Sequence, residues 1–242
     1  MKINQIKNFF LDLFFPKKCL GCGKSDTYLC SDCFSRLSMR QDQIINNTCF
    51  FCGKISWQGK ICTEHKPEVY LDRIISTAEY KNPLIREIIK TLKYRYVQEL
   101  SVPLSQLLIK TLQNNWSLGI DHWGFIVVPI PLHKFRLRKR GFNQAELLAK
   151  PIADYFNLSI RTDILERITP TDPQANIKNT DKRKSNLKDI FNINAENAKT
   201  IEGTNIILID DVCTTGATLI EAARVLKLNG AREIWGLTVA KG

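Results

Sequence analysis

Hydrophobic residues after residue 67 follow two regular patterns that predict strands and helices in alternation. Short continuous apolar runs are typical of strands buried on both faces, and apolar residues three and four positions apart are typical of amphipathic helices. We expect strands at residues 71–80, 124–129, 205–209 and 233–239, and helices at residues 83–94, 98–112, 143–155 and 215–228. This order predicts an α/β domain with a mostly parallel sheet flanked by helices.

A separate apolar stretch precedes Pro16 and includes Ile3, Ile6 and residues 9–15. It is too short to span a bilayer, which takes about 20 apolar residues. It contains Asp12 and lacks a small-residue cleavage site, so it does not resemble a signal peptide. We interpret it as a retained amphipathic helix that packs on the core, with peripheral membrane contact as the alternative. No transmembrane segment is predicted, and a cytoplasmic location is expected.

Composition places the chain among globular proteins. It has 242 residues, of which 44% are hydrophobic and 24% charged, and it carries no repeats, which excludes disordered, fibrous and membrane classes. The length suits one domain with a small appendage, and we expect a boundary between residues 1–67 and 68–242. Lysine and arginine outnumber acidic residues by 35 to 24, and the net charge of +11 favours polyanionic partners.

Seven of the eight cysteines fall between residues 19 and 62, and this clustering indicates metal binding rather than disulfides. With one histidine, they form four pairs of potential ligands, each with two residues between its members, and Gly21, Gly23 and Gly53 permit tight turns. Eight sulfur and nitrogen ligands would complete two closed tetrahedral sites, which is typical of structural zinc. The candidate ligands are Cys19, Cys22, Cys30, Cys33, Cys49, Cys52, Cys62 and His65.

The pairs can combine in sequence or in a cross-braced pattern. Ser31 and Asp32 look like the start of a helix whose N-terminus would favour a thiolate, and this favours sequential pairing. His65 completes the fourth pair, although a lone surface histidine is the alternative interpretation. Such a small module has few large apolar side chains and could hardly fold without its metal.

The strand at residues 205–209 is followed by two carboxylates and then by hydroxyls and small residues that open a helix. Free amides at a helix N-terminus bind phosphate, threonine hydroxyls can add donors, and the carboxylates can accept hydrogen bonds from ribose. The segment lacks the glycine pattern of a Walker loop or of a dinucleotide-binding turn. It therefore predicts a ribose-phosphate site at Asp210, Asp211, Cys213, Thr214, Thr215, Gly216, Ala217 and Thr218. Within it, we interpret Cys213 as a small packed residue rather than a catalytic thiol.

This segment resembles the phosphoribosyl pyrophosphate (PRPP) loop of type I phosphoribosyltransferases. Residues 128–148 and 80–94, together with the cysteine pairs, are similar to the ComF/GntX family of competence protein F. That resemblance implies a double zinc ribbon joined to a phosphoribosyltransferase domain. It also implies that the chain binds PRPP with Mg²⁺ and handles imported single-stranded DNA in the cytoplasm during natural transformation. A DNA-translocation motor or a recombination mediator would be a further partner.

A second candidate surface is the segment 134–140, in which five of seven residues are basic. This density suits pyrophosphate or a nucleic-acid backbone, and a solvated charge run is the alternative. A polar stretch at residues 169–189 resembles the family's flexible loop over the ribose site, or is disordered with no ligand role. The predicted pyrophosphate or nucleic-acid contacts are Arg136, Arg138 and Arg140 in the first segment, Asn143 and Gln144 just after it, and Arg183 in the second.

Three functions stay open from the sequence. The first is a ComF-type competence protein. In it, the bases of the DNA would stack on Tyr94, Tyr96 or Phe142, unless these aromatic residues belong to the core. The alternatives are a metabolic phosphoribosyltransferase that transfers ribose phosphate to a nucleobase and a non-catalytic PRPP sensor. Turnover usually requires a general base, and His133 is the nearest candidate. Among its basic neighbours, however, His133 is better suited to donate a hydrogen bond to phosphate than to act as a base.

Overall fold

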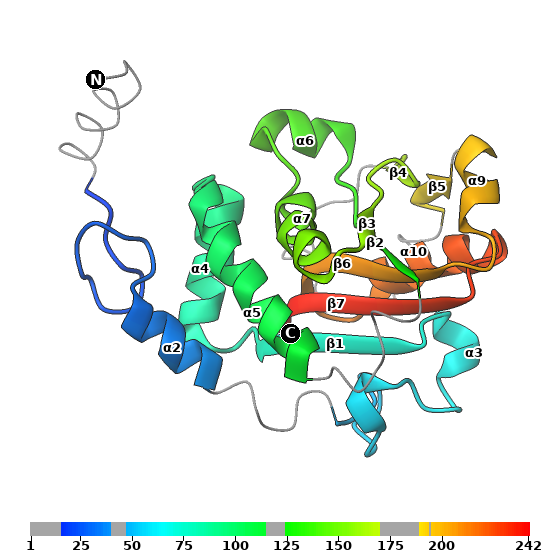
Figure 1. The fold of residues 1–242 in the computed structure, drawn as a ribbon, viewed down its shortest axis with the longest axis horizontal. Coiled ribbons are helices and arrows are strands. Elements are labelled where there is room, and N and C mark those ends of the chain that lie inside the picture. The colour runs from blue at the N-terminus through cyan, green and yellow to red at the C-terminus, as the bar shows by residue number, and fades with distance from the viewer. Residues whose placement is uncertain (1–15, 40–46, 115–123, 170–188, 194) are drawn as a thin grey trace.

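The computed structural model describes residues 16–39, 47–114, 124–169, 189–193 and 195–242. A five-stranded parallel sheet forms its centre, in the order β1-β7-β6-β2-β3 (Figure 1). Its strands are β1 (Arg73–Glu79), β2 (Phe125–Pro129), β3 (Ser159–Ile160), β6 (Asn205–Cys213) and β7 (Glu233–Lys241). The expected α/β architecture with a mostly parallel sheet is confirmed.

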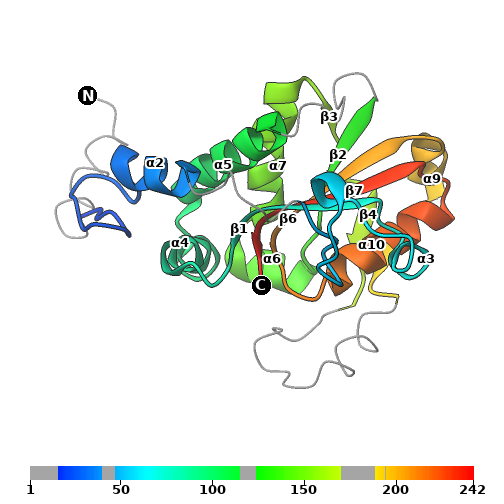
Figure 2. The same ribbon diagram turned by 90° about the horizontal axis from the view of Figure 1, so that it is seen from below.

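Helices cover both faces of this sheet. Helices α4 (Pro83–Tyr94), α5 (Ser101–Asn114) and α7 (Gln144–Phe156) lie on one face, and α10 (Ala217–Leu228) lies on the other (Figures 1 and 2). The shorter elements are α2 (Ser31–Met39), η2 (Trp57–Gly59), α3 (Lys66–Val69), η3 (Gln98–Leu100), α6 (Lys134–Arg140), α9 (Ala195–Ile201) and an antiparallel pair, β4 (Leu165–Arg167) with β5 (Phe191–Ile193).

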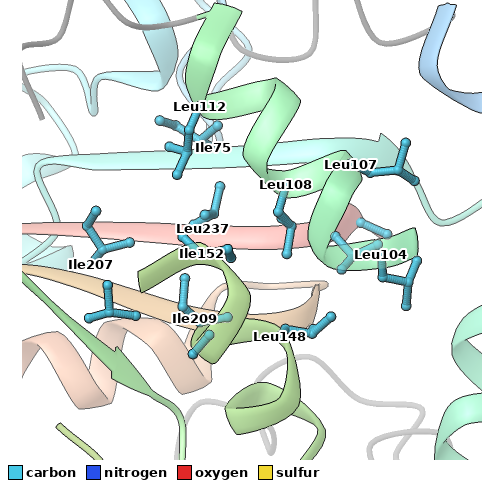
Figure 3. Packing of buried hydrophobic residues seen from close by; sticks show 14 of the residues in the cluster. Ile75, Leu104, Leu107, Leu108, Leu112, Leu148, Ile152, Ile207, Ile209 and Leu237 are labelled. Atoms are coloured by element: carbon cyan, nitrogen blue, oxygen red, sulfur yellow. The ribbon is translucent and has the colours of Figure 1, made fainter. Parts of the chain in front are cut away.

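The alternation of side chains along β6 divides the core in two. Ile207 and Ile209 point into a cluster formed with α4, α5 and α7, which Figure 3 shows beside Leu108, Leu148 and other apolar side chains. Ile206 and Leu208 point into a second cluster formed with α10, β4 and β5. Because both faces of β6 are buried, its sequence reads as a continuous apolar run.

The observed elements differ from the expected ones at the candidate phosphate site. Strand β6 continues to Cys213, because β7 pairs with it as far as Lys241, so Asp210 and Asp211 lie within the strand rather than after it. Helix α10 begins at Ala217 rather than at residue 215. The expected helix at 98–112 is divided between η3 and α5, and the short strands β3, β4 and β5 were not anticipated.

The two cysteine-rich segments pack on different parts of the domain. The first, residues 16–39, lies beside α4 and α5, as Figure 1 shows for α2. The second, residues 47–65, lies at the β1 edge, where Lys60 forms an isolated antiparallel bridge with Arg73. The predicted amphipathic helix at residues 1–15 lies outside the described residues. No helix in the described part of the chain is long and apolar enough to cross a bilayer.

Candidate functional site

The first four predicted zinc ligands converge in the first segment. The Sγ atoms of Cys19, Cys22, Cys30 and Cys33 all lie within 4.8 Å of one another. Cys22 Sγ and Cys30 Sγ are 3.6 Å apart, which fits the edge of about 3.8 Å of a tetrahedron with zinc–sulfur bonds of about 2.3 Å. Glycine is required at residue 21, because a Cβ atom there would lie 2.7 Å from Cys33 Sγ. These residues fit a four-cysteine zinc site.

The other four ligands converge in the second segment. The side-chain ligand atoms of Cys49, Cys52, Cys62 and His65 also lie within 4.8 Å of one another. Cys52 Sγ is 3.8 Å from Cys62 Sγ, and Cys62 Sγ is 3.1 Å from His65 Nδ1. Both segments therefore fit structural zinc, and their ligands group in sequence rather than in the cross-braced pattern. His65 joins its set, which excludes the interpretation of an isolated surface histidine.

The predicted phosphate loop connects β6 to α10 at the carboxyl edge of the parallel sheet, where ligands of such sheets bind. A hollow beside it is lined by Asp210, Val212, Cys213, Thr214, Gly216, Ala217, Thr218 and Leu219. Gly216 precedes the helix with φ of +79°, a conformation that favours glycine. The first amides of α10 have no partners within the helix, so the loop offers donors for a phosphate.

The two carboxylates in β6 face opposite sides of the sheet. Asp211 is buried and forms an ion pair with Lys93 of α4, with 2.8 Å between Oδ2 and Nζ. Burial by itself would lower the pKa of Lys93, but the charges of Asp211 and Asp210 outweigh it and raise that pKa. Lys93 thus stays charged at neutral pH and neutralises Asp211. Sequence reasoning missed Lys93 because its helical spacing does not indicate a contact with β6.

Asp210 lies on the other side of β6, beside the loop. Its Oδ1 accepts a hydrogen bond from the Asp211 amide at 2.8 Å. Burial, and after it the charge of Asp211, raises the pKa of Asp210. Burial, and then the charge of Arg136, lowers the pKa of Arg167 to about 10, while Asp210 opposes this shift. Arg167 of β4 is therefore a second charged residue near the loop that sequence reasoning missed.

Cys213 is packed rather than reactive. It is buried at the end of β6. Burial, and then the charge of Asp210, raises the pKa of its thiol, which disfavours the nucleophilic thiolate. Cys213 also lies outside both groups of metal-ligating side chains in the described structure.

The basic segment forms helix α6, which has no buried residues. Arg138 is exposed, and Arg136 and Arg140 are partly exposed. Lys134 Nζ forms an ion pair with Glu166 of β4 at 2.8 Å, which links the helix to the strand that carries Arg167. The helix therefore presents a basic surface next to the candidate phosphate site.

The polar residues that follow α6 are engaged within the fold. Asn143 precedes α7, where its Oδ1 accepts a hydrogen bond from the Ala145 amide at 3.1 Å and its Nδ2 donates to the Ile130 carbonyl at 3.1 Å. Gln144 is buried and accepts a hydrogen bond from Arg140. These contacts give both residues a structural role, and their predicted contact with a ligand stays a prediction. Arg183 and the rest of residues 170–188 lie outside the described residues.

Family models match both parts of the chain. A double zinc ribbon domain matches residues 10–65, and a phosphoribosyl transferase domain matches residues 143–241. The second match includes the loop between β6 and α10, and the first includes all eight predicted zinc ligands. The fold expected from the resemblance, a phosphoribosyltransferase domain with a double zinc ribbon, is therefore confirmed.

Curated proteins match most of the chain. Competence protein F of Haemophilus influenzae is 27% identical over 241 residues, covering 94% of this chain and 99% of that protein. Competence protein ComFC of Bacillus subtilis is 31% identical over 86% of this chain and 81% of its own length. DNA utilization protein YhgH of Escherichia coli K12 is 32% identical over 68% of this chain and 71% of its own. Both domains match, and the alignments cover more than two thirds of these relatives. The chain therefore belongs to the competence protein F/ComFC and YhgH family of double-zinc-ribbon proteins with a phosphoribosyltransferase domain.

Proposed function

We propose that the chain binds PRPP with Mg²⁺ in the loop between β6 and α10, and that it handles imported single-stranded DNA in the cytoplasm during natural transformation. The observation that carries the proposal is the loop itself. Hydroxyls and small residues lead into α10 directly after Cys213, the last residue of β6, at the carboxyl edge of a parallel sheet. In this arrangement residues 214–218 hold the 5′-phosphate, and Asp210 accepts hydrogen bonds from the ribose hydroxyls.

Helix α6 is the proposed surface for the DNA backbone. Its arginines match phosphate oxygens, and its neighbour Arg167 extends positive charge toward the loop. Phe135 lies among these arginines with 69% of its surface exposed, and it offers a ring for a stacked base. Tyr94 and Tyr96 are also exposed, whereas Phe142 is buried and belongs to the core.

The proposal assigns PRPP as a bound ligand and names no acceptor. His133 precedes α6, and its Nδ1 accepts a hydrogen bond from the Phe135 amide at 3.3 Å. This contact gives the histidine a capping role, so it disfavours its assignment as a general base. A ligand-controlled scaffold or sensor therefore fits the site better than a transferase that acts on a nucleobase.

Asp210→Asn tests the ribose-phosphate site. Replacing both carboxylates would be ambiguous, because Asp211→Asn also leaves the partly buried Lys93 without its anion. The amide of asparagine replaces one acceptor oxygen with a donor, so a ribose hydroxyl loses its acceptor. PRPP binding is expected to weaken about tenfold, since leaving a buried polar group without its partner costs about 1–3 kcal/mol. Isothermal calorimetry with PRPP and Mg²⁺ measures this. Thermal unfolding serves as the control for the fold, and unchanged affinity would place PRPP elsewhere.

Replacing Arg136, Arg138 and Arg140 by glutamine is expected to weaken binding of single-stranded DNA and to flatten its salt dependence. Each lost phosphate contact reduces the slope of log affinity against log salt concentration by about 0.7 on a single strand, so the three together reduce it by about 2. Fluorescence anisotropy with a short labelled oligonucleotide at several salt concentrations gives the slope.

The matched control removes the same charge elsewhere. Lys24, Lys60 and Lys199 are exposed and lie outside α6, so their replacement by glutamine is expected to leave most of the slope in place. If both triple variants lose the same slope, the binding is a property of net charge and not of α6. A motor or a recombination mediator stays a predicted partner.

A further inference from the structure

We propose that the second zinc site shapes the phosphate loop through the ring of Phe51, so that zinc in this site, and not in the first, controls the affinity of the loop for phosphate. The controlling residues are the second ligand set, Cys49, Cys52, Cys62 and His65, and the two phenylalanines between Cys49 and Cys52. The statement about affinity rests on the proposed function, whereas the statement about loop structure does not.

The ring of Phe51 lies directly against the loop. A Cβ atom on Gly216 would be 3.2 Å from Phe51 Cε1 and 3.4 Å from Cζ, so the ring edge covers the residue that immediately precedes α10. Gly216 holds a positive φ there, and Ile220 N donates to the Gly216 carbonyl at 2.8 Å. The ring therefore supports the turn from which the first amides of the helix project.

Phe50 reaches the other end of the same loop. Lys241 Nζ lies over its ring, 4.6 Å from the centroid. Lys241 pairs with Cys213, the last residue of β6, in the β6–β7 register. The rings of Phe50 and Phe51 are 5.2 Å apart and nearly perpendicular. Of these two adjacent residues of the zinc-binding turn, Phe51 thus lies against the start of the helix, and Phe50 contacts the residue of β7 that pairs with the end of β6.

The metal ligands hold these rings in place. Phe51 stacks on His65 with 5.6 Å between ring centroids and 24° between planes. Cys49 N donates to the Lys54 carbonyl at 2.8 Å, and Gly53 N donates to the Cys49 carbonyl at 2.9 Å, which closes the turn around the ligands. Without zinc, the four ligand side chains take up protons and lose the bonds that join them through the metal, so the turn loses its defined shape.

The first ribbon contains the same turn but contacts other elements. Its residues at the positions of Phe50 and Phe51 are Leu20 and Gly21. A Cβ on Gly21 would lie 3.1 Å from Leu84 Cδ2 of α4, and Lys17 pairs with Glu99 at 2.8 Å. These contacts go to α4 and η3, and none of the contacts described for the first ribbon reaches the loop between β6 and α10. The first zinc site therefore serves as the experimental comparison for the second.

Phe51→Ala, compared with Phe34→Ala in α2, tests the connection without removing a ligand. Phe34 is a partly buried aromatic residue of the first ribbon that lies under Lys110. Both variants are expected to retain two zinc ions by elemental analysis. In Phe51→Ala alone, hydrogen exchange of the Ile220 amide accelerates, and PRPP affinity falls about tenfold if the competent loop conformation falls to about one tenth of the population.

A second pair of variants removes one zinc each. Cys22→Ser and Cys52→Ser replace exposed cysteines at equivalent positions of the two ribbons. Accelerated exchange at Ile220 in Cys52→Ser, and unchanged exchange in Cys22→Ser, supports the proposal. Equal exchange in both, or unchanged exchange in Phe51→Ala, overturns it. If exchange changes as expected but the parent protein binds no PRPP, the connection stands and the proposed function fails.

Discussion

Lys93→Met lowers the free energy of unfolding by about 3–5 kcal/mol, because it leaves the Asp211 carboxylate buried without a cation. Only 3% of the Asp211 side chain is exposed, and Lys93 Nζ at 2.8 Å is the cation paired with it in the described structure. The cost comes from the uncompensated charge rather than from lost packing, since methionine fills much of the volume of the lysine stem. Chemical denaturation followed by circular dichroism measures the change.

Two further variants make this expectation specific. Lys90→Met, on the exposed face of the same helix, is expected to change stability by no more than about 0.5 kcal/mol. The double variant Lys93→Met/Asp211→Leu removes both charges and is expected to recover a large part of the loss. If the two single losses simply add in the double variant, the ion pair does not hold α4 to β6.

Replacing Cys19 and Cys22 by serine is expected to remove one zinc and to unfold the first ribbon. The buried cluster within this ribbon consists of Cys19, Cys30 and Cys33. Because the described residues of the ribbon form no larger apolar core of their own, the metal supplies most of its folding free energy. Structural zinc contributes on the order of 10 kcal/mol of apparent folding free energy to such small modules. Elemental analysis gives the zinc content, and limited proteolysis reports cleavage within residues 16–39.

Cys213→Ser is the matched control for the loss of a cysteine. Cys213 is buried and lies in neither ligand group, so this variant is expected to retain both zinc ions even if it lowers stability. Retention of two zinc ions in the Cys19→Ser/Cys22→Ser variant would contradict the assignment of its ligands. Loss of zinc in Cys213→Ser would show that zinc content follows general stability rather than ligation.

The parts of the fold that follow a repeating pattern were predictable. Helix α4 begins and ends at the expected residues 83 and 94, because Asn82 accepts hydrogen bonds from the Leu84 and Ile85 amides and Pro83 suits the first turn. The zinc ligands were predictable because local spacing places both members of each pair on one turn. Their sequential grouping was favoured by the same local geometry.

The remaining features depend on contacts that local sequence does not encode. The extension of β6 to Cys213 follows from its pairing with β7, which outweighs the poor strand propensity of two aspartates. The pairing of Lys93 with Asp211 joins residues more than 100 positions apart, and Arg167 approaches Asp210 only through β4. The contact of Phe51 with Gly216 arises in the same way, because it joins two matched domains across the fold.

The strand order β1-β7-β6-β2-β3 has a consequence for synthesis on the ribosome. Strands β6 and β7 lie between β1 and β2 in the sheet but are translated after both. Until they emerge, β1 lacks its β7 neighbour, and the apolar faces of α4, α5 and α7 have no complete sheet to cover. Each zinc ribbon, in contrast, draws its ligands from fewer than 20 consecutive residues. A nascent chain therefore passes through a stage in which its ribbons can be folded while long-range strand pairing waits, and this is the stage at which chaperones would be needed most.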